Sequence, residues 1–175
     1  MKTLQRKFTM LAAVAMLAAP MFAKSPKAPP TLADKVTHEL NMLPYYTVFD
    51  DVSFRVDGST VTLFGDVTQP WLKTDAENAV KQVEGVTHVN SEINVLPLSP
   101  MDHQIRFAAY RAIYGYPALQ RYAVGNYRPI RIIVNNGHVK LIGTVSSAMD
   151  KQLAYMRASG VPNVFSVEND LSIEK

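Results

Sequence analysis

The chain has 175 residues, of which 18 are basic and 15 acidic, so its formal net charge is +3. It contains no cysteine, which excludes disulfide bonds, thiolate metal sites and a lipid-modified cysteine behind a signal peptide. This length accommodates either one domain or two small ones, so internal pattern has to decide the domain count.

The first 23 residues carry the pattern of a cleavable secretory signal peptide. Lys2, Arg6 and Lys7 precede the apolar run 10–19, and the small residue Ala23 follows it. The run is about half as long as the roughly 20 apolar residues that a transmembrane helix needs. We therefore expect cleavage after Ala23 and a soluble, periplasmic protein without a lipid anchor.

Loss of this segment changes the electrostatic balance of the chain. Its three basic residues account for the whole net charge, so the mature chain has 15 basic and 15 acidic residues. A basic footprint for nucleic acid must survive processing, and this excess does not. We expect no nucleic acid among the partners.

The first folded module is expected over residues 31–97, behind a linker at residues 24–30. Thr31 and Asp34 form a capping-box pattern, which predicts the start of a helix. The apolar residues of this helix make one stripe, so it has one face to bury. These residues are Leu32, Val36, Leu40 and Leu43.

A hairpin, a second helix and a third strand follow. The segments 52–56 and 61–67 alternate apolar and polar residues, as strands with one buried face do. The turn at 57–59 contains Asp and Gly, which tolerate the positive φ that hairpins require. Pro70 suits the first turn of a helix, and residues 86–95 predict the closing strand.

The same series recurs 78 residues later. The segment 52–56 falls on 130–134, and 61–67 falls on 139–145. The register continues into the second helix, where Lys73 matches Lys151, and through the third strand. A gap-free register across four elements indicates a duplication. Gly65 and Gly143, which match each other, are interpreted as close-packing or bulge positions.

The second module is therefore expected over residues 98–175, with capping-box patterns that open its helices at Ser99 and Ser147. The predicted fold class is α+β, with two repeated modules. Each runs helix, strand, strand, helix, strand, and its small three-stranded mixed sheet is covered by two helices.

These residues resemble a known family. A strand, a Gly-containing turn, Val-x-Leu-x-Gly-x-Val, a helix and then Gly-Val-x-x-Val with a short strand is similar to the BON domain. Tandem BON domains behind a signal peptide are similar to the OsmY-type osmotically inducible periplasmic proteins. The resemblance implies phospholipid binding and a role in maintaining the bacterial envelope, and it carries no catalytic residue.

The second module departs from this pattern in two places. Asn163 stands where the first module has Gly85, and asparagine is the usual alternative to glycine at a left-handed helix end. The link between the first helix and the hairpin is also longer, since 17 positions separate Ile113 from Ile130 and 12 separate Leu40 from Val52.

The motifs of common enzymes are missing. His38 and Glu39 begin like a zinc-protease helix, but the second histidine one turn later is absent, so His38 is interpreted as a solvated residue. The other histidines stand singly, and neither a nucleophile elbow nor a Gly-rich phosphate loop occurs. We expect no catalytic site, no metal and no cofactor.

Charge differs sharply between the two modules. Residues 24–99 hold six basic and ten acidic residues, whereas residues 100–175 hold nine and five. Charges of about −4 and +4 favour docking between the modules. They also favour an anionic surface as the partner of the second module.

The first helix of the second module has two stripes. Small and apolar residues suit packing on a sheet, while aromatic and basic residues lie on roughly the opposite side. The link that follows, residues 115–128, interleaves tyrosine with arginine, a composition that suits lipid headgroups. The predicted membrane-binding or partner-binding residues are Arg106, Phe107, Tyr110, Arg111, Tyr114, Tyr116, Arg121, Tyr122, Tyr127 and Arg128.

Two alternatives stay open at this point. Phe107, Tyr110 and Tyr114 are equally well explained by packing under the first module or under the link, with the arginines paired to acids such as Asp50 and Asp51. The partner is either an anionic phospholipid membrane, whose binding would support envelope integrity under osmotic or envelope stress, or other envelope proteins, for which the chain would be an adaptor or chaperone-like module. Trp71 is assigned to a core or inter-module contact, with an interfacial anchor as the alternative.

Overall fold

The computed structural model of this chain describes residues 29–124 and 128–174. The predicted signal peptide lies outside the described residues. The first module contains α1 (Leu32–Asn41), β1 (Asp51–Asp57), β2 (Thr60–Val67), α2 (Pro70–Lys81) and β3 (His88–Val95). The second contains α3 (Pro100–Tyr114), the 3-10 helix η1 (Pro117–Ala123), β4 (Ile130–Asn135), β5 (His138–Val145), α4 (Ala148–Ser159) and β6 (Ser166–Ile173).

Each module is built on a three-stranded mixed sheet. The hairpin strands β1 and β2 are antiparallel, and β3 returns parallel to β2, so β2 is central. The order β4, β5, β6 repeats this arrangement. The helix between the second and third strands makes the crossover that a parallel pair requires. The predicted fold class is confirmed in both modules.

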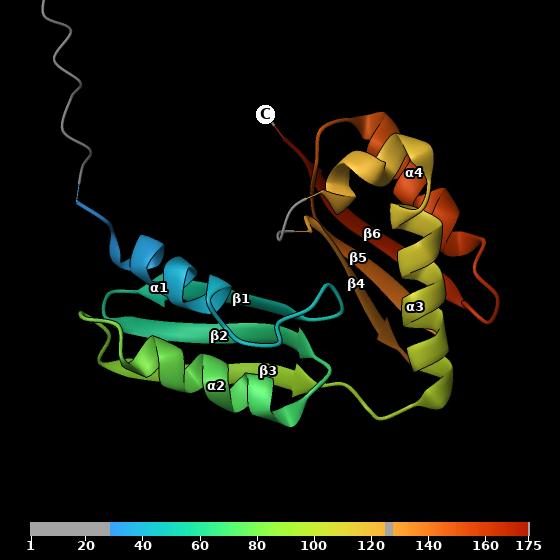
Figure 1. Cartoon of the computed structure of the whole chain (residues 1–175). Coiled ribbons are helices and arrows are strands. Elements are labelled where there is room, and N and C mark those ends of the chain that lie inside the picture. Colours follow the sequence, from blue (N-terminus) through green and yellow to red (C-terminus); the bar gives the residue numbers. More distant parts are fainter. Residues whose placement is uncertain (1–28, 125–127, 175) are drawn as a thin grey trace, which may run out of the picture.

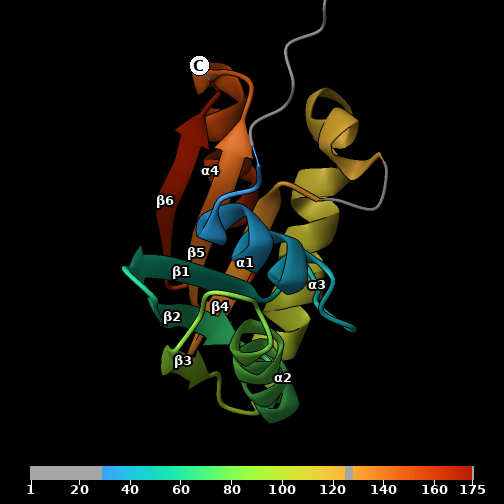
Figure 2. The same ribbon diagram turned by 90° about the vertical axis from the view of Figure 1, so that its left-hand side faces the viewer.

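Two helices cover one face of each sheet. Along β2 the residues Val61, Leu63 and Val67 are fully buried, while Phe64 between them is exposed. They form one core cluster with Val36 of α1 and with residues of α2. Figure 2 shows α1 and α2 side by side over this sheet. Alternation along the strands thus produces a core on one side and a polar face on the other.

The offset of 78 residues relates hydrogen bonds of the two modules as well as their amino-acid sequences. Lys73 Nζ donates to the Ile93 carbonyl at 2.9 Å, and Lys151 Nζ donates to the Leu171 carbonyl at 2.6 Å. The amide of Thr87 donates to the Ser59 carbonyl, and that of Phe165 donates to the Gly137 carbonyl, both at 2.9 Å. The two lysines therefore join the crossover helix to the third strand in the same way in both modules.

The capping box at the start of α1 is complete, whereas the one expected at the start of α3 is not. Thr31 and Asp34 exchange both hydrogen bonds of the box. Ser99 accepts from the Asp102 amide at 3.1 Å, but the Asp102 carboxylate accepts instead from the amides of Asn136 and Gly137 at 2.9 and 2.8 Å. Since the hairpin turn uses this carboxylate, the full box predicted at Ser99 is wrong, and Asp102 joins α3 to the turn.

Gly65 and Gly143 occupy the close-packing positions expected from the sequence. Their φ angles are 125° and 126°, which L side chains rarely adopt. A Cβ atom would meet the backbone carbonyl of Asp51 at Gly65 and that of Pro129 at Gly143. Glycine is therefore required where the central strand passes the start of the hairpin.

Replacement of Gly143 by alanine is expected to lower the free energy of unfolding by more than about 2 kcal/mol, because strain in φ adds to a clash with backbone. Urea unfolding followed by circular dichroism measures this change. Gly160→Ala is the matched control, since Gly160 has a φ of −80° and its nearest neighbour would lie at 3.6 Å. Equal unfolding midpoints for the two variants would contradict the assignment.

Candidate functional site

The two stripes predicted for α3 are only partly separated in the structure. Ile105, Ala109 and Ile113 are buried against the second sheet, as a sheet-facing stripe requires. Phe107 and Arg111 on the other side are exposed, and Tyr110 is half-buried. Tyr114, the last residue of the predicted outer stripe, is buried instead.

The hydroxyl of Tyr114 holds the start of β4. It donates to the Ile130 carbonyl at 2.7 Å and accepts from the Ile130 amide at 3.1 Å. Burial raises the pKa of this tyrosine. In the first module the Tyr46 hydroxyl accepts from the amide of Val52, the residue that matches Ile130. A tyrosine thus anchors the first strand of each module.

Three of the ten residues predicted to contact a partner are therefore buried within the protein. Arg106 is 6% exposed and donates from Nη2 to the Val134 carbonyl at 2.8 Å. Tyr122 accepts from the Ser146 amide at 2.8 Å through its hydroxyl. With Tyr114, these side chains have protein partners because α3 and η1 pack onto the sheet. Burial of Tyr114 agrees with the packing alternative, whereas the exposure expected for Arg106 and Tyr122 is corrected.

Truncation of Tyr114 to phenylalanine is expected to cost about 1 to 3 kcal/mol of unfolding free energy, because it leaves the buried amide of Ile130 without this acceptor. The measurement is the urea midpoint of the full chain. Tyr155→Phe, at a side chain that is 37% exposed, is the matched control and should change the midpoint little. A neutral effect of Tyr114→Phe would show that the hydroxyl is not an anchor.

Arg121 is exposed, but it is tied to the protein. It makes an ion pair with Asp150 and lies over the Tyr122 ring, with its Cζ at 5.1 Å from the centroid. Asp150 is buried and also accepts from the hydroxyls of Ser147 and Tyr122. Burial by itself would raise the pKa of Asp150, but these hydrogen bonds and Arg121 lower it below its usual value of 3.8.

The sign of this shift fixes a pH dependence. A carboxylate whose pKa is lowered in the folded state adds stability above the pKa of the unfolded chain and loses it as the pH falls through the folded value. Asp150→Asn should therefore destabilise the protein by about 1 to 3 kcal/mol at pH 7. The difference from the unaltered chain should shrink in urea titrations toward pH 3. A difference independent of pH would contradict this role.

The first module covers part of the outer stripe. The Phe49 ring lies at 5.2 Å from the Phe107 ring and at 6.3 Å from the Tyr110 ring, both edge to face. Beside it, the amide of Ile132 donates to the Val48 carbonyl at 2.7 Å. The segment 46–49 thus lies along the edge strand β4, and Figure 1 shows β2 and β3 ending toward the second module.

Charges of opposite sign meet at this junction. Arg131 donates to the Thr47 carbonyl at 2.7 Å and lies over the Tyr46 ring at 4.5 Å. Burial raises the pKa of Asp51, while Arg131 and Lys140 of the second module oppose that shift. Asp50, which was considered as an arginine partner, accepts hydrogen bonds from Thr47 and Thr68 instead. The proposal that opposite charge drives the docking of the two modules remains a prediction.

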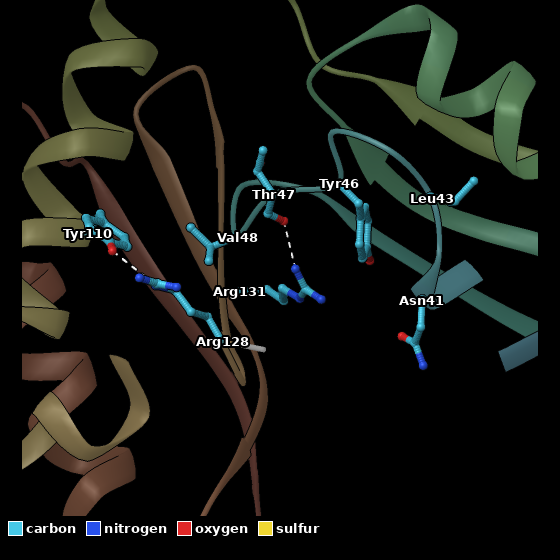
Figure 3. Close-up of a pocket in the computed structure, with 8 residues that line it drawn as sticks. All are labelled: Asn41, Leu43, Tyr46, Thr47, Val48, Tyr110, Arg128 and Arg131. Carbon is cyan, nitrogen blue, oxygen red and sulfur yellow. Dashed lines mark hydrogen bonds between the residues drawn. The ribbon is translucent and has the colours of Figure 1, made fainter. Parts of the chain in front are cut away.

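A pocket of about 560 Å³ opens at the junction, and residues of both modules line it. Figure 3 shows Arg128 beside Tyr110 and Arg131 beside the Thr47 carbonyl. Arg128 Nε donates to the Tyr110 hydroxyl at 3.0 Å, and its guanidinium lies near the Tyr114 ring. The chemistry of this pocket is two guanidinium groups with two phenol rings, a composition that suits an anion.

The remaining predicted residues lie apart from this pocket. Arg111 is exposed near His103 and Pro162, and Tyr116 lies under Arg157, whose Cζ is 5.0 Å from the ring centroid. Tyr127 lies outside the described residues. Residue types alone did not identify Arg131, Tyr46 or Arg157. For Arg131, the sequence gave one indication of a role at the junction, which is a basic residue on the polar side of β4.

Two acids in the helices of the second module do not reach its surface. Residues 100–159 contain eight basic residues and two acids, Asp102 and Asp150. The structure buries both acids, at 0% and 3% exposure. Arg111 and Arg157 are exposed on the helices that surround them. Arg106 is buried as well, so the exposed charge on the helical side is carried by arginines such as Arg111 and Arg157.

Membrane-spanning helices and metal-binding clusters are both absent from the described residues. No helix within residues 29–124 and 128–174 has the length and apolar character needed to cross a membrane. The same part of the chain contains no group of three or more His, Asp or Glu side chains placed to hold a metal ion.

Fold and site together define a tandem repeat protein of two α+β modules with a basic helical side. The BON domain family matches the chain twice, at residues 30–97 and 118–175, so the chain belongs to this family. It is 30% identical over 132 residues to osmotically-inducible protein Y of Escherichia coli (strain K12), covering 69% of this chain and 61% of that relative. The resemblance drawn from the repeat is confirmed.

Two solved structures of one protein also align with the chain. Both are of CdsD, a structural protein of the type III secretion system of Chlamydia trachomatis, and one is its C-terminal domain. Each has 12% sequence identity and a TM-score of 0.29 over 82% of this chain. The aligned parts are 98% and 92% of those two chains.

Proposed function

We propose that this protein is a non-catalytic periplasmic protein that binds anionic phospholipid surfaces through the helical side of its second module. The observation that carries the proposal is the exposure of Arg111 and Arg157 on the helical side, where Asp102 and Asp150 are buried. Arginine guanidinium groups pair with phosphate through two parallel hydrogen bonds, and tyrosine rings suit the interface beside them.

The expected strength of binding follows from the exposed cations. Each basic residue held near an anionic bilayer contributes about 1 kcal/mol, and salt screens this attraction. Arg111 and Arg157 are exposed, and Arg128 and Arg131 are partly exposed at the junction pocket. Together they would supply a few kcal/mol at most. Binding is therefore reversible and sensitive to ionic strength.

The name of the relative supports a role in osmotic or envelope stress. That relative is described as osmotically inducible, and the matched region spans 61% of its length. A protein that binds membrane surfaces reversibly can support the envelope when osmotic stress changes its area. We assign the same role to this chain, with the signal peptide at residues 1–23 as its route of export.

Cosedimentation with vesicles tests the membrane proposal. The mature chain should sediment with vesicles that contain phosphatidylglycerol at low salt and be released at high salt. Arg111→Glu combined with Arg157→Glu should weaken this binding by at least about 30-fold, because it removes two contributions of about 1 kcal/mol and adds repulsion.

The control variant is Arg55→Glu, which changes the charge of an exposed strand residue in the first module. It should sediment as the unaltered chain does, apart from a small effect of total charge. Equal binding to neutral and anionic vesicles, or binding to neither, would overturn the proposal. That result would favour the alternative of an adaptor for envelope proteins.

A further inference from the structure

A second hollow lies at the junction and shares one lining residue, Thr47, with the arginine pocket. It has a volume of about 780 Å³ and is bounded by the start of α2, the connection between the modules and the first half of α3. Trp71, Leu98 and Phe107 line it and are 50%, 91% and 42% exposed. Phe49 also lines it, where it meets Phe107. We call this hollow the junction groove.

Large apolar side chains gathered around a concavity mark an interaction site when they stay exposed. The sequence favoured a core or inter-module contact for Trp71, and the structure leaves half of its surface accessible. Leu98 lies in the connection between the modules and is almost fully exposed. Both side chains contribute to the groove more than to the core.

The residues that line the groove favour an uncharged occupant over an anionic membrane. Fourteen residues line it, none of them is acidic, and its one lysine or arginine is Arg106, which is buried. An anionic bilayer needs exposed cations beside the apolar anchors. Uncharged hydrogen-bonding side chains line the groove instead, among them Thr68, Gln69 and Gln104.

Arg106 adds a second observation. Its side chain borders the groove, and the residue is only 6% exposed. Nη2 donates to the Val134 carbonyl, but Nε has no hydrogen-bond partner among the described residues. Buried donors are normally satisfied, so an unpaired one beside a cavity indicates a missing acceptor. A carbonyl oxygen in this end of the groove would supply it.

We infer that the junction groove binds an extended, uncharged and apolar segment of another polypeptide. Such a segment offers apolar side chains to Trp71, Leu98 and Phe107. Its backbone offers hydrogen-bonding groups to the amide side chains and a carbonyl to Arg106. An uncharged ligand matches a lining without exposed charge. None of the exposed arginines assigned to membrane binding lines the groove, so its function does not depend on membrane binding.

Fluorescence of Trp71 tests this inference directly, because Trp71 is the one tryptophan of the chain. The probe is a short peptide of Val, Phe, Thr and Gln with acetylated and amidated ends. Its addition to the mature chain should shift the emission to shorter wavelength in a saturable titration, since the ligand removes water from the indole. A peptide of equal length made of Lys and Glu should cause no shift.

Leu98→Glu should weaken peptide binding by about tenfold or more, because a bound apolar segment would bury the new carboxylate. Leu98 is highly exposed, so the fold is retained, as circular dichroism will check. Met149→Glu, at an exposed methionine on α4, is the matched control and should bind as the unaltered chain does. Equal affinities for Leu98→Glu and Met149→Glu, or no shift in emission, would overturn the inference.

Two further measurements separate this site from the membrane site. The double variant Arg111→Glu, Arg157→Glu should keep peptide affinity while it loses vesicle binding. If neutral vesicles alone shift Trp71 emission in the unaltered chain but not in Leu98→Glu, the occupant is lipid and the peptide assignment is wrong.

Discussion

Burial of a single sheet face is the constraint on which the rest of the structure depends. Two helices cover one side of each three-stranded sheet, so the strands alternate and the other side is polar. Ile133 of β4 departs from this rule, because it pairs with Lys140 on the polar side and yet is 3% exposed. Asp66 and Leu96 of the first module surround the same hollow as Ile133. A small sheet with one open face is thus completed by its neighbour.

The two modules keep the contacts that hold the sheet and differ in those that reach outward. Lys73 and Lys151 bind matching carbonyls, and a tyrosine hydroxyl anchors each first strand. Asp50 accepts from the Thr68 amide in the first module, whereas the Tyr122 hydroxyl accepts from the matching Ser146 amide in the second. Exchange of an acid for a neutral hydroxyl removes negative charge from the second module.

Two surfaces of different chemistry result from this division. The helical side of the second module presents arginines whose neighbouring acids are buried, so long-range attraction to anions dominates there. The junction groove carries apolar and amide side chains, so it favours contacts of short range. Since the groove needs residues from both modules, it exists only where they are joined, whereas the basic side belongs to the second module alone.

The sequence by itself determined the repeat, the element order and the glycine positions, because period-two alternation, caps and turn residues act over a few neighbouring residues. It did not determine which aromatic and basic side chains face outward. Tyr114 and Tyr122 read as surface residues, yet each becomes buried when α3 and η1 fold back on a sheet whose strands lie later in the chain. The covering of Tyr110 by Phe49 depends on contact between modules. Such burial is set by residues far apart in sequence, and only the tertiary structure brings them together.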